Sequence, residues 1–138
     1  MEMDQHIKFW LDSADHDLEA AESLLASDKF DWCLFLGHLV LEKALKAVYV
    51  RDNENQMPPR THNLVKIADA TSLKIDENIR IFLDEVTAFN LEIRYPDYRR
   101  DFFKRCTQAF SENKIKQIKD FLQWLKDNLQ SRPSLKDT

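Results

Sequence analysis

The sequence contains very little glycine, a single residue at Gly37 in a chain of 138 residues. Globular proteins average about 7% glycine, because the tight turns between strands need its conformational freedom. A chain with one glycine therefore does not fit a many-stranded sheet. It also contains no glycine-rich phosphate loop of the GxGxxG or Walker type, since each of these motifs needs at least two glycines.

Long apolar runs and a disulfide framework are also lacking. No apolar run approaches the ~20 residues of a membrane span, and the first residues, MEMDQHIKFW, have no signal-peptide pattern. The two cysteines, Cys33 and Cys106, lie far apart within apolar stretches, which favours reduced and buried thiols. We therefore expect a cytoplasmic protein that makes no contact with a membrane.

The charge balance excludes a protein that binds nucleic acid over its whole surface. The formal net charge is −4, with 20 Lys and Arg against 24 Asp and Glu, whereas such proteins are normally basic. Any anion site must therefore be local. The apolar fraction of 43% and the charged fraction of 32% fit one globular domain. We assign residues 1–130 to that domain and residues 131–138 to a disordered tail.

Helical periodicity runs through most of the chain. Over residues 4–26 the apolar positions alternate steps of four and three, which is typical of an amphipathic helix. Residues 31–50 are apolar nearly all round, which predicts a central helix. Thr61 and Ser111 are candidate N-caps of a short helix and of the last helix, and an apolar stripe predicts another helix over 76–93. The fold class is therefore all-α, an up-and-down bundle of four long helices and one short helix.

A basic and aromatic segment follows the fourth predicted helix, which Pro96 ends. Residues 94–105 read RYPDYRRDFFKR, with an irregular pattern that is compatible with the start of another helix. Guanidinium groups bind phosphate oxygens and aromatic rings stack on bases, so the segment suits a nucleotide or an RNA end. In the structural alternative, Tyr95 and Pro96 pack the loop while Arg94 and Asp97 form ion pairs.

The central helix carries one polar stripe. His38, Glu42 and Lys46 follow each other at intervals of four, which places them on one helix face. They form either a buried polar network or dimer contact, with Glu42 and Lys46 paired, or part of a wall that faces a ligand. Two ligands do not make a metal site, so we predict neither a metal nor a cofactor.

A second histidine, His62, stands near the start of the short predicted helix. A neutral imidazole there is able to bond a phosphate or to act as a base near neutral pH. In the alternative interpretation His62 caps or orients the loop. Adjacent helix ends would also be able to bring His62 close to Arg94, which would combine an arginine with a histidine in one site.

Four motifs occur in a fixed order along the chain. They are WLDSADHDLEAA at 10–21, LVLEKALKA at 39–47, THNL at 61–64 and RYPD at 94–97. In this order and spacing they closely resemble the HEPN domain family (higher eukaryotes and prokaryotes nucleotide-binding), over about residues 7–130. The resemblance implies a bundle similar to the C-terminal domain of kanamycin nucleotidyltransferase. It also implies frequent dimerisation and, for many members, a minimal nucleotidyltransferase partner in a two-component, often toxin–antitoxin, system.

Several HEPN groups are metal-independent ribonucleases in which a histidine follows an arginine after four to six residues. No arginine of this chain has a histidine at that spacing, which argues against an enzyme. The favoured hypothesis is a module that binds a nucleotide or nucleic-acid phosphate, as a homodimer or with a nucleotidyltransferase. An atypical ribonuclease toxin and a purely structural interaction domain are the alternatives. We predict no catalytic residue; the predicted ligand-binding residues are Arg94, Tyr95, Asp97, His62, Arg99, Glu42, Lys46 and His38.

Overall fold

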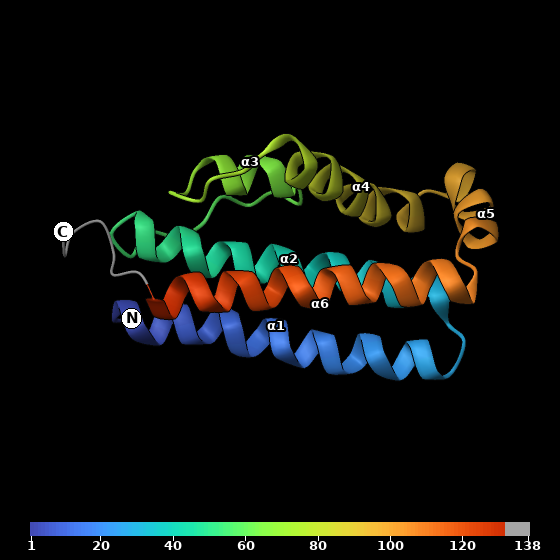
Figure 1. Cartoon of the computed structure of the whole chain (residues 1–138), viewed down its shortest axis with the longest axis horizontal. Helices are drawn as coiled ribbons and strands as arrows, with labels where there is room; N and C mark the ends of the chain where they lie inside the picture. The colour runs from blue at the N-terminus through green and yellow to red at the C-terminus, as the bar shows by residue number, and fades with distance from the viewer. Residues whose placement is uncertain (132–138) are drawn as a thin grey trace.

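The computed structural model describes residues 1–131, which form six α-helices and no strand. The helices are α1 (Met3–Ala26), α2 (Phe30–Asp52), α3 (Leu64–Asp69), α4 (Glu77–Arg94), α5 (Pro96–Arg105) and α6 (Gln108–Ser131). Figure 1 shows α1, α2 and α6 running along the longest axis, with α4 beyond α2 and α5 across one end. The predicted all-α bundle of four long helices is confirmed, and α5 is a second short helix that the prediction did not include.

Helix α2 is the centre of the bundle, as its all-round apolar sequence predicts. It packs against each of the other five helices. Gly37 lies on the α6 side of α2, where an added Cβ would come within 2.7 Å of the Ile118 Cδ1 atom. The single glycine of the chain therefore permits close packing between two helices, and it does not form a turn.

The predicted N-cap of α3, Thr61, is wrong by two residues. The helix begins at Leu64, and the side chain of Asn63 accepts a hydrogen bond from the Lys66 N–H at 3.1 Å. The Thr61 hydroxyl accepts from the Asn63 N–H instead. Two residues with capping side chains lie close together here, and the one that directly precedes the apolar residue makes the cap.

The predicted N-cap of α6, Ser111, is also wrong. Helix α6 begins at Gln108, and only two residues separate it from the end of α5. The Thr107 hydroxyl accepts from the Phe110 N–H at 3.2 Å, so Thr107 performs the capping role. Ser111 lies inside the first turn, and its hydroxyl is buried without a hydrogen-bond partner in the described chain.

Residues 94–105, irregular in sequence pattern, form a helix that is fixed to α4. Pro96 occupies the first turn of α5, where its fixed φ suits a helix and its missing N–H costs nothing. Arg105 pairs with Glu92 of α4 at 3.0 Å, and Phe102 packs against Phe89 with ring centroids 5.6 Å apart. The proline that ends α4 therefore also begins α5.

Two further predictions concern the ends of the chain and membranes. Residues 132–138, most of the predicted tail, lie outside the described residues. Within 1–131, no helix has both the length and the apolar character needed to cross a bilayer.

Candidate functional site

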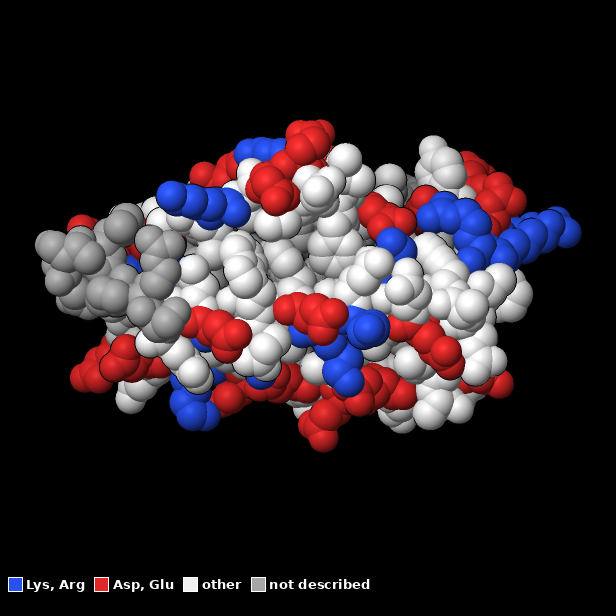
Figure 2. Space-filling view, in the orientation of Figure 1, with Lys and Arg blue, Asp and Glu red and all other residues white. Residues whose placement is uncertain are grey.

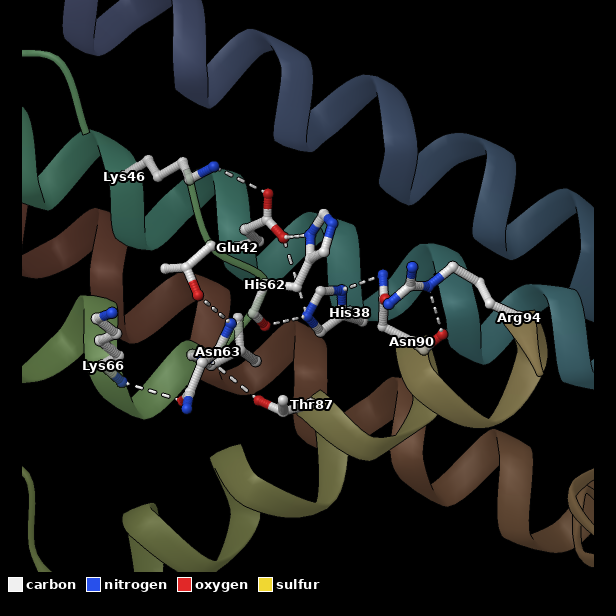
Figure 3. A network of polar contacts seen from close by, with 11 residues as sticks. His38, Glu42, Lys46, His62, Asn63, Lys66, Thr87, Asn90 and Arg94 are labelled. Atoms are coloured by element: carbon white, nitrogen blue, oxygen red, sulfur yellow. Dashed lines mark hydrogen bonds and ion pairs between the residues drawn. The ribbon is translucent and has the colours of Figure 1, made fainter. Parts of the chain in front are cut away.

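A polar network connects α2 with the loop before α3 and with α4 (Figure 3). Its centre is Glu42, which is 5% exposed. One carboxylate oxygen accepts from the Lys46 ammonium at 3.0 Å, and the other lies 2.7 Å from His62 Nδ1. A buried carboxylate is stable only when its partners replace the lost water, and Glu42 has two such partners.

His62 is the member of this network that reaches solvent. Its side chain is 55% exposed, and it contacts Glu42 through Nδ1. A carboxylate oxygen accepts hydrogen bonds, so Nδ1 carries the hydrogen in this contact and Nε2 is the acceptor nitrogen of the neutral ring. The loop that carries His62 is fixed to α4, because the Thr87 hydroxyl accepts from the Leu64 N–H at 3.1 Å.

His38 lies behind His62 and is fully buried. Its Nε2 donates to the His62 carbonyl oxygen at 2.7 Å, which leaves Nδ1 as an acceptor 3.4 Å from the Asn90 amide nitrogen. Burial lowers the pKa of His38, and this outweighs the opposite effects of the bond to the His62 carbonyl and of the nearby Glu42 charge. A neutral His38 therefore bonds the backbone of His62 on one side and Asn90 on the other.

Asn90 and Arg94 extend the network along α4. Asn90 is 2% exposed, and its side-chain oxygen is buried with no hydrogen-bond partner in residues 1–131. Arg94 donates through Nε to the Asn90 carbonyl oxygen at 3.2 Å, and its guanidinium lies 5.7 Å from the centre of the Tyr95 ring. His62 and Arg94, distant in sequence, thus belong to one continuous set of contacts.

Helix α5 adds a basic and aromatic surface next to Arg94. We call it the basic-aromatic corner; it consists of Arg94, Tyr95, Tyr98, Arg99, Arg100, Phe103 and Lys104. Figure 2 shows Lys and Arg side chains gathered at this end of the molecule. Tyr95, Tyr98 and Phe103 are 48%, 55% and 64% exposed. Large aromatic side chains beside cations are therefore open to solvent here.

The cations of the corner have few internal partners. Arg99 lies over the Trp32 ring of α2, with its guanidinium carbon 5.0 Å from the ring centre. Arg94, Arg99, Arg100 and Lys104 form no ion pair with any carboxylate of the described chain. Neither Arg94 nor Asp97 forms an ion pair within residues 1–131, so the ion pairs of the structural alternative are absent there. Asp97 lies exposed in the first turn of α5.

Comparisons with known proteins agree with this architecture. A family model described as "HEPN domain" matches residues 7–128. The chain belongs to the HEPN domain family. It is similar in structure to TT1696 from Thermus thermophilus, with a TM-score of 0.74 and 18% sequence identity over 88% of this chain and 96% of that chain. A search of curated proteins found no match.

Membership in the family relates this HEPN domain to nucleotides and nucleic acids at the level of the family. The predicted ligand-binding residues fall into two groups in the fold. One group is the network of His38, Glu42, Lys46, His62 and Arg94, and the other is the surface of α5 with Tyr95, Asp97 and Arg99. The two groups meet at Arg94.

Two residues of this HEPN domain were missed by sequence reasoning. Asn90 follows the core residue Phe89 on the buried stripe of α4, and a polar residue on such a stripe is a detectable signal. Trp32 carries no such signal, since its contact with Arg99 arises only when α5 crosses the end of α2. No group of three or more His, Cys, Asp or Glu within residues 1–131 is placed to hold a metal.

Proposed function

We propose that this HEPN domain binds the phosphate of a nucleotide or nucleic acid at the basic-aromatic corner. The observation that carries the proposal is a set of cations without carboxylate partners in a chain whose net charge is −4. Arg99, Arg100 and Lys104 keep their charges available to a ligand, because none of them forms an ion pair with a carboxylate of the described chain. Charge-assisted bonds from guanidinium groups are the strong form of phosphate contact.

The aromatic side chains favour a ligand that carries a base as well as a phosphate. Tyr95, Tyr98 and Phe103 are exposed on the same short helix region as the cations. Stacking of a base on an aromatic side chain is worth about 1–3 kcal/mol and tolerates any base. A nucleotide or the end of a single strand combines both chemistries, whereas a free phosphate would leave the rings unused.

The polar network supports the site from behind. Glu42 and His38 together fix the ring and the backbone of His62, and Arg94 is bonded to Asn90. Protein side chains that are held in place in this way lose less conformational entropy when they bind a ligand. In this proposal His62 and Arg94 contact the ligand, whereas His38, Glu42 and Lys46 act as positioning residues.

The proposal is tested by fluorescence anisotropy with a labelled single-stranded RNA of ten nucleotides, and by thermal shift with ATP and GTP. The double variant R100A/K104A should bind at least tenfold more weakly, a loss of about 1.4 kcal/mol. The double variant K74A/K116A removes two other exposed cations and serves as the matched control. Equal weakening by the two double variants, or no binding by the wild type, would contradict the proposal.

A second candidate is the atypical ribonuclease, which one observation favours. The contact of 2.7 Å between Glu42 and His62 Nδ1 resembles the carboxylate–imidazole pairs that orient a general base. In this case the wild type should cleave RNA in the presence of EDTA, and His62→Asn should abolish cleavage while it retains RNA binding. Intact RNA after prolonged incubation with the wild type would exclude this activity for the RNA tested.

We also propose that the domain works as a homodimer or with a minimal nucleotidyltransferase, in a toxin–antitoxin pair. The support is the family to which the chain belongs. Light scattering coupled to size-exclusion chromatography measures the mass of the protein alone. Co-purification with a co-expressed minimal nucleotidyltransferase measures the second association. A monomer that captures no such partner would contradict both.

A further inference from the structure

A groove of about 520 Å³ lies between α4 and α6, and none of its lining residues belongs to the corner or to the polar network. Its apolar lining consists of Ile79 and Phe82 from α4 with Phe121 and Trp124 from α6. In Figure 2 the strip between these two helices is mostly uncharged. The groove is therefore a separate surface feature with its own chemistry.

The floor of the groove is an aromatic cluster in which Phe121 is buried and Trp124 is the exposed member. The ring centroids of Phe82 and Phe121 are 5.9 Å apart, and those of Phe121 and Trp124 are 5.3 Å apart. Trp124 keeps 37% of its surface exposed although its neighbours are packed. An exposed concave apolar patch of this kind is typical of a site that another molecule covers.

The charges that line the groove are all negative. Among the described residues, Asp76 and Asp120 are the only ionisable ones that line it. The Asp76 side chain accepts from the Ile79 N–H at 2.8 Å and so serves as the cap of α4. Asp120 is exposed and has no ion-pair or hydrogen-bond partner within the described range. Asp120 is therefore the carboxylate that is free to attract a cation.

No cation of the described chain forms an ion pair with this carboxylate, including Lys116 four residues before it on α6. Lys114 donates to Gln117 at the edge of the groove at 3.3 Å, but it is paired with Glu85 at 2.5 Å. The faces of aromatic rings also attract cations, and Trp is the most effective ring. A free carboxylate beside an exposed Trp ring therefore selects a positively charged group.

The shape of the groove indicates what carries that charge. Gln117, Asp120, Phe121 and Trp124 are spaced three and four apart, so they form one face of α6 over about two turns, or ~10 Å. A hydrophobic groove along a helix is the usual receptor for the apolar face of a second helix. An extended ligand with apolar and cationic side chains fits better here than a compact anion.

We propose that the α4–α6 groove docks a basic amphipathic helix of a partner protein. A Lys or Arg side chain of the partner lies between the Asp120 carboxylate and the Trp124 ring, and its apolar side chains cover Phe82 and Phe121. This surface works independently of the basic-aromatic corner, which attracts the opposite charge. The domain therefore presents an anion site at one end and a cation-selective groove along its side.

The test uses a fluorescein-labelled peptide of 14 Leu and Lys residues, with Leu at helical i, i+3, i+4 spacing. A peptide with Glu in place of Lys is its counterpart. We expect the Lys peptide to bind at least tenfold more tightly than the Glu peptide. Asp120→Lys and, separately, Trp124→Ala should each weaken it at least tenfold, or by about 1.4 kcal/mol. Glu19→Lys makes the same charge change on the exposed face of α1 and should leave binding within threefold of the wild type.

Three results would overturn the proposal. One is the absence of Lys-peptide binding at protein concentrations up to about 100 micromolar, which is on the order of the dissociation constant of a weak peptide complex. Another is equal weakening by Glu19→Lys and Asp120→Lys, since the peptide would then respond only to net charge. The third is a wild-type dimer in sedimentation velocity that Trp124→Ala dissociates, because a second copy would then occupy the groove. Circular dichroism checks that each variant is folded.

Discussion

His38 is expected to make the stability of the domain depend on pH between about 7.5 and 5.0. Burial lowers the pKa of this histidine below its ordinary value of 6.5. The unfolded chain therefore binds a proton at His38 more readily than the folded chain does. Under this condition the free energy of unfolding falls as the pH falls through the ordinary value, and the stabilising contribution of His38 is complete only above that value.

The size of the effect follows from proton linkage. One proton bound only by the unfolded state changes the free energy of unfolding by about 1.4 kcal/mol per pH unit. If His38 stays neutral in the fold down to pH 5.0, the loss between pH 7.5 and 5.0 reaches about 2 kcal/mol. The fold favours the neutral ring, since His38 is fully buried and both ring nitrogens have hydrogen-bond partners that suit the neutral form.

The assay is urea unfolding at several pH values in that range, followed by circular dichroism. The informative variant is His38→Gln, because the Gln amide nitrogen is able to replace Nε2 as the donor to the His62 carbonyl but does not titrate. The difference in pH dependence between wild type and His38→Gln isolates His38 from the other titrating groups. His16→Gln, at an exposed position of α1, is the matched control.

Parallel pH curves for wild type and His38→Gln would refute this reasoning. They would mean that folded His38 takes up its proton as easily as the unfolded chain, despite its burial. A stronger pH dependence of stability in His38→Gln than in the wild type would also refute it. If the pH dependence were lost in His16→Gln and kept in His38→Gln, the responsible group would be His16 and not His38.

Three further predictions concern stability and reactivity. Glu42→Ala should destabilise the fold by about 3 kcal/mol in urea unfolding, since it leaves the buried Lys46 ammonium without its partner. Gly37→Ala should cost about 1–3 kcal/mol through overpacking, and adding Ile118→Val, which removes the Cδ1 atom in the way, should recover part of it. The two buried cysteines should react with Ellman's reagent only as the chain unfolds, because burial raises both thiol pKa values to about 12.

Each of these predictions has a clear contrary result. A Glu42→Ala protein as stable as the wild type would show that the Lys46 ammonium finds water or another acceptor. A double variant no more stable than Gly37→Ala alone would mean that Ile118 is not the obstacle. Rapid thiol labelling in native buffer, at a rate independent of urea, would show that the cysteines are accessible in the folded protein.

Most of the helical architecture could be predicted from local sequence patterns. The central position of α2 followed from apolar residues on all its faces, and the long helices followed from their apolar stripes. Such patterns work because a helix must bury its apolar face, whichever neighbour covers it. The caps at Thr61 and Ser111 were predicted wrongly. Neighbouring polar residues compete for the same cap, and the length of the connection between helices decides between them.

The candidate site depended on tertiary structure to a much greater degree. The stripe of His38, Glu42 and Lys46 could be found by spacing, but its partners could not. His38 contacts the His62 carbonyl and the Asn90 amide, which lie 24 and 52 positions away in the sequence. Helical periodicity determines which residues share a face. Only the crossing of helices decides which side chains of different elements come within hydrogen-bond distance, and here that crossing joins α2, the loop before α3 and α4 into one network.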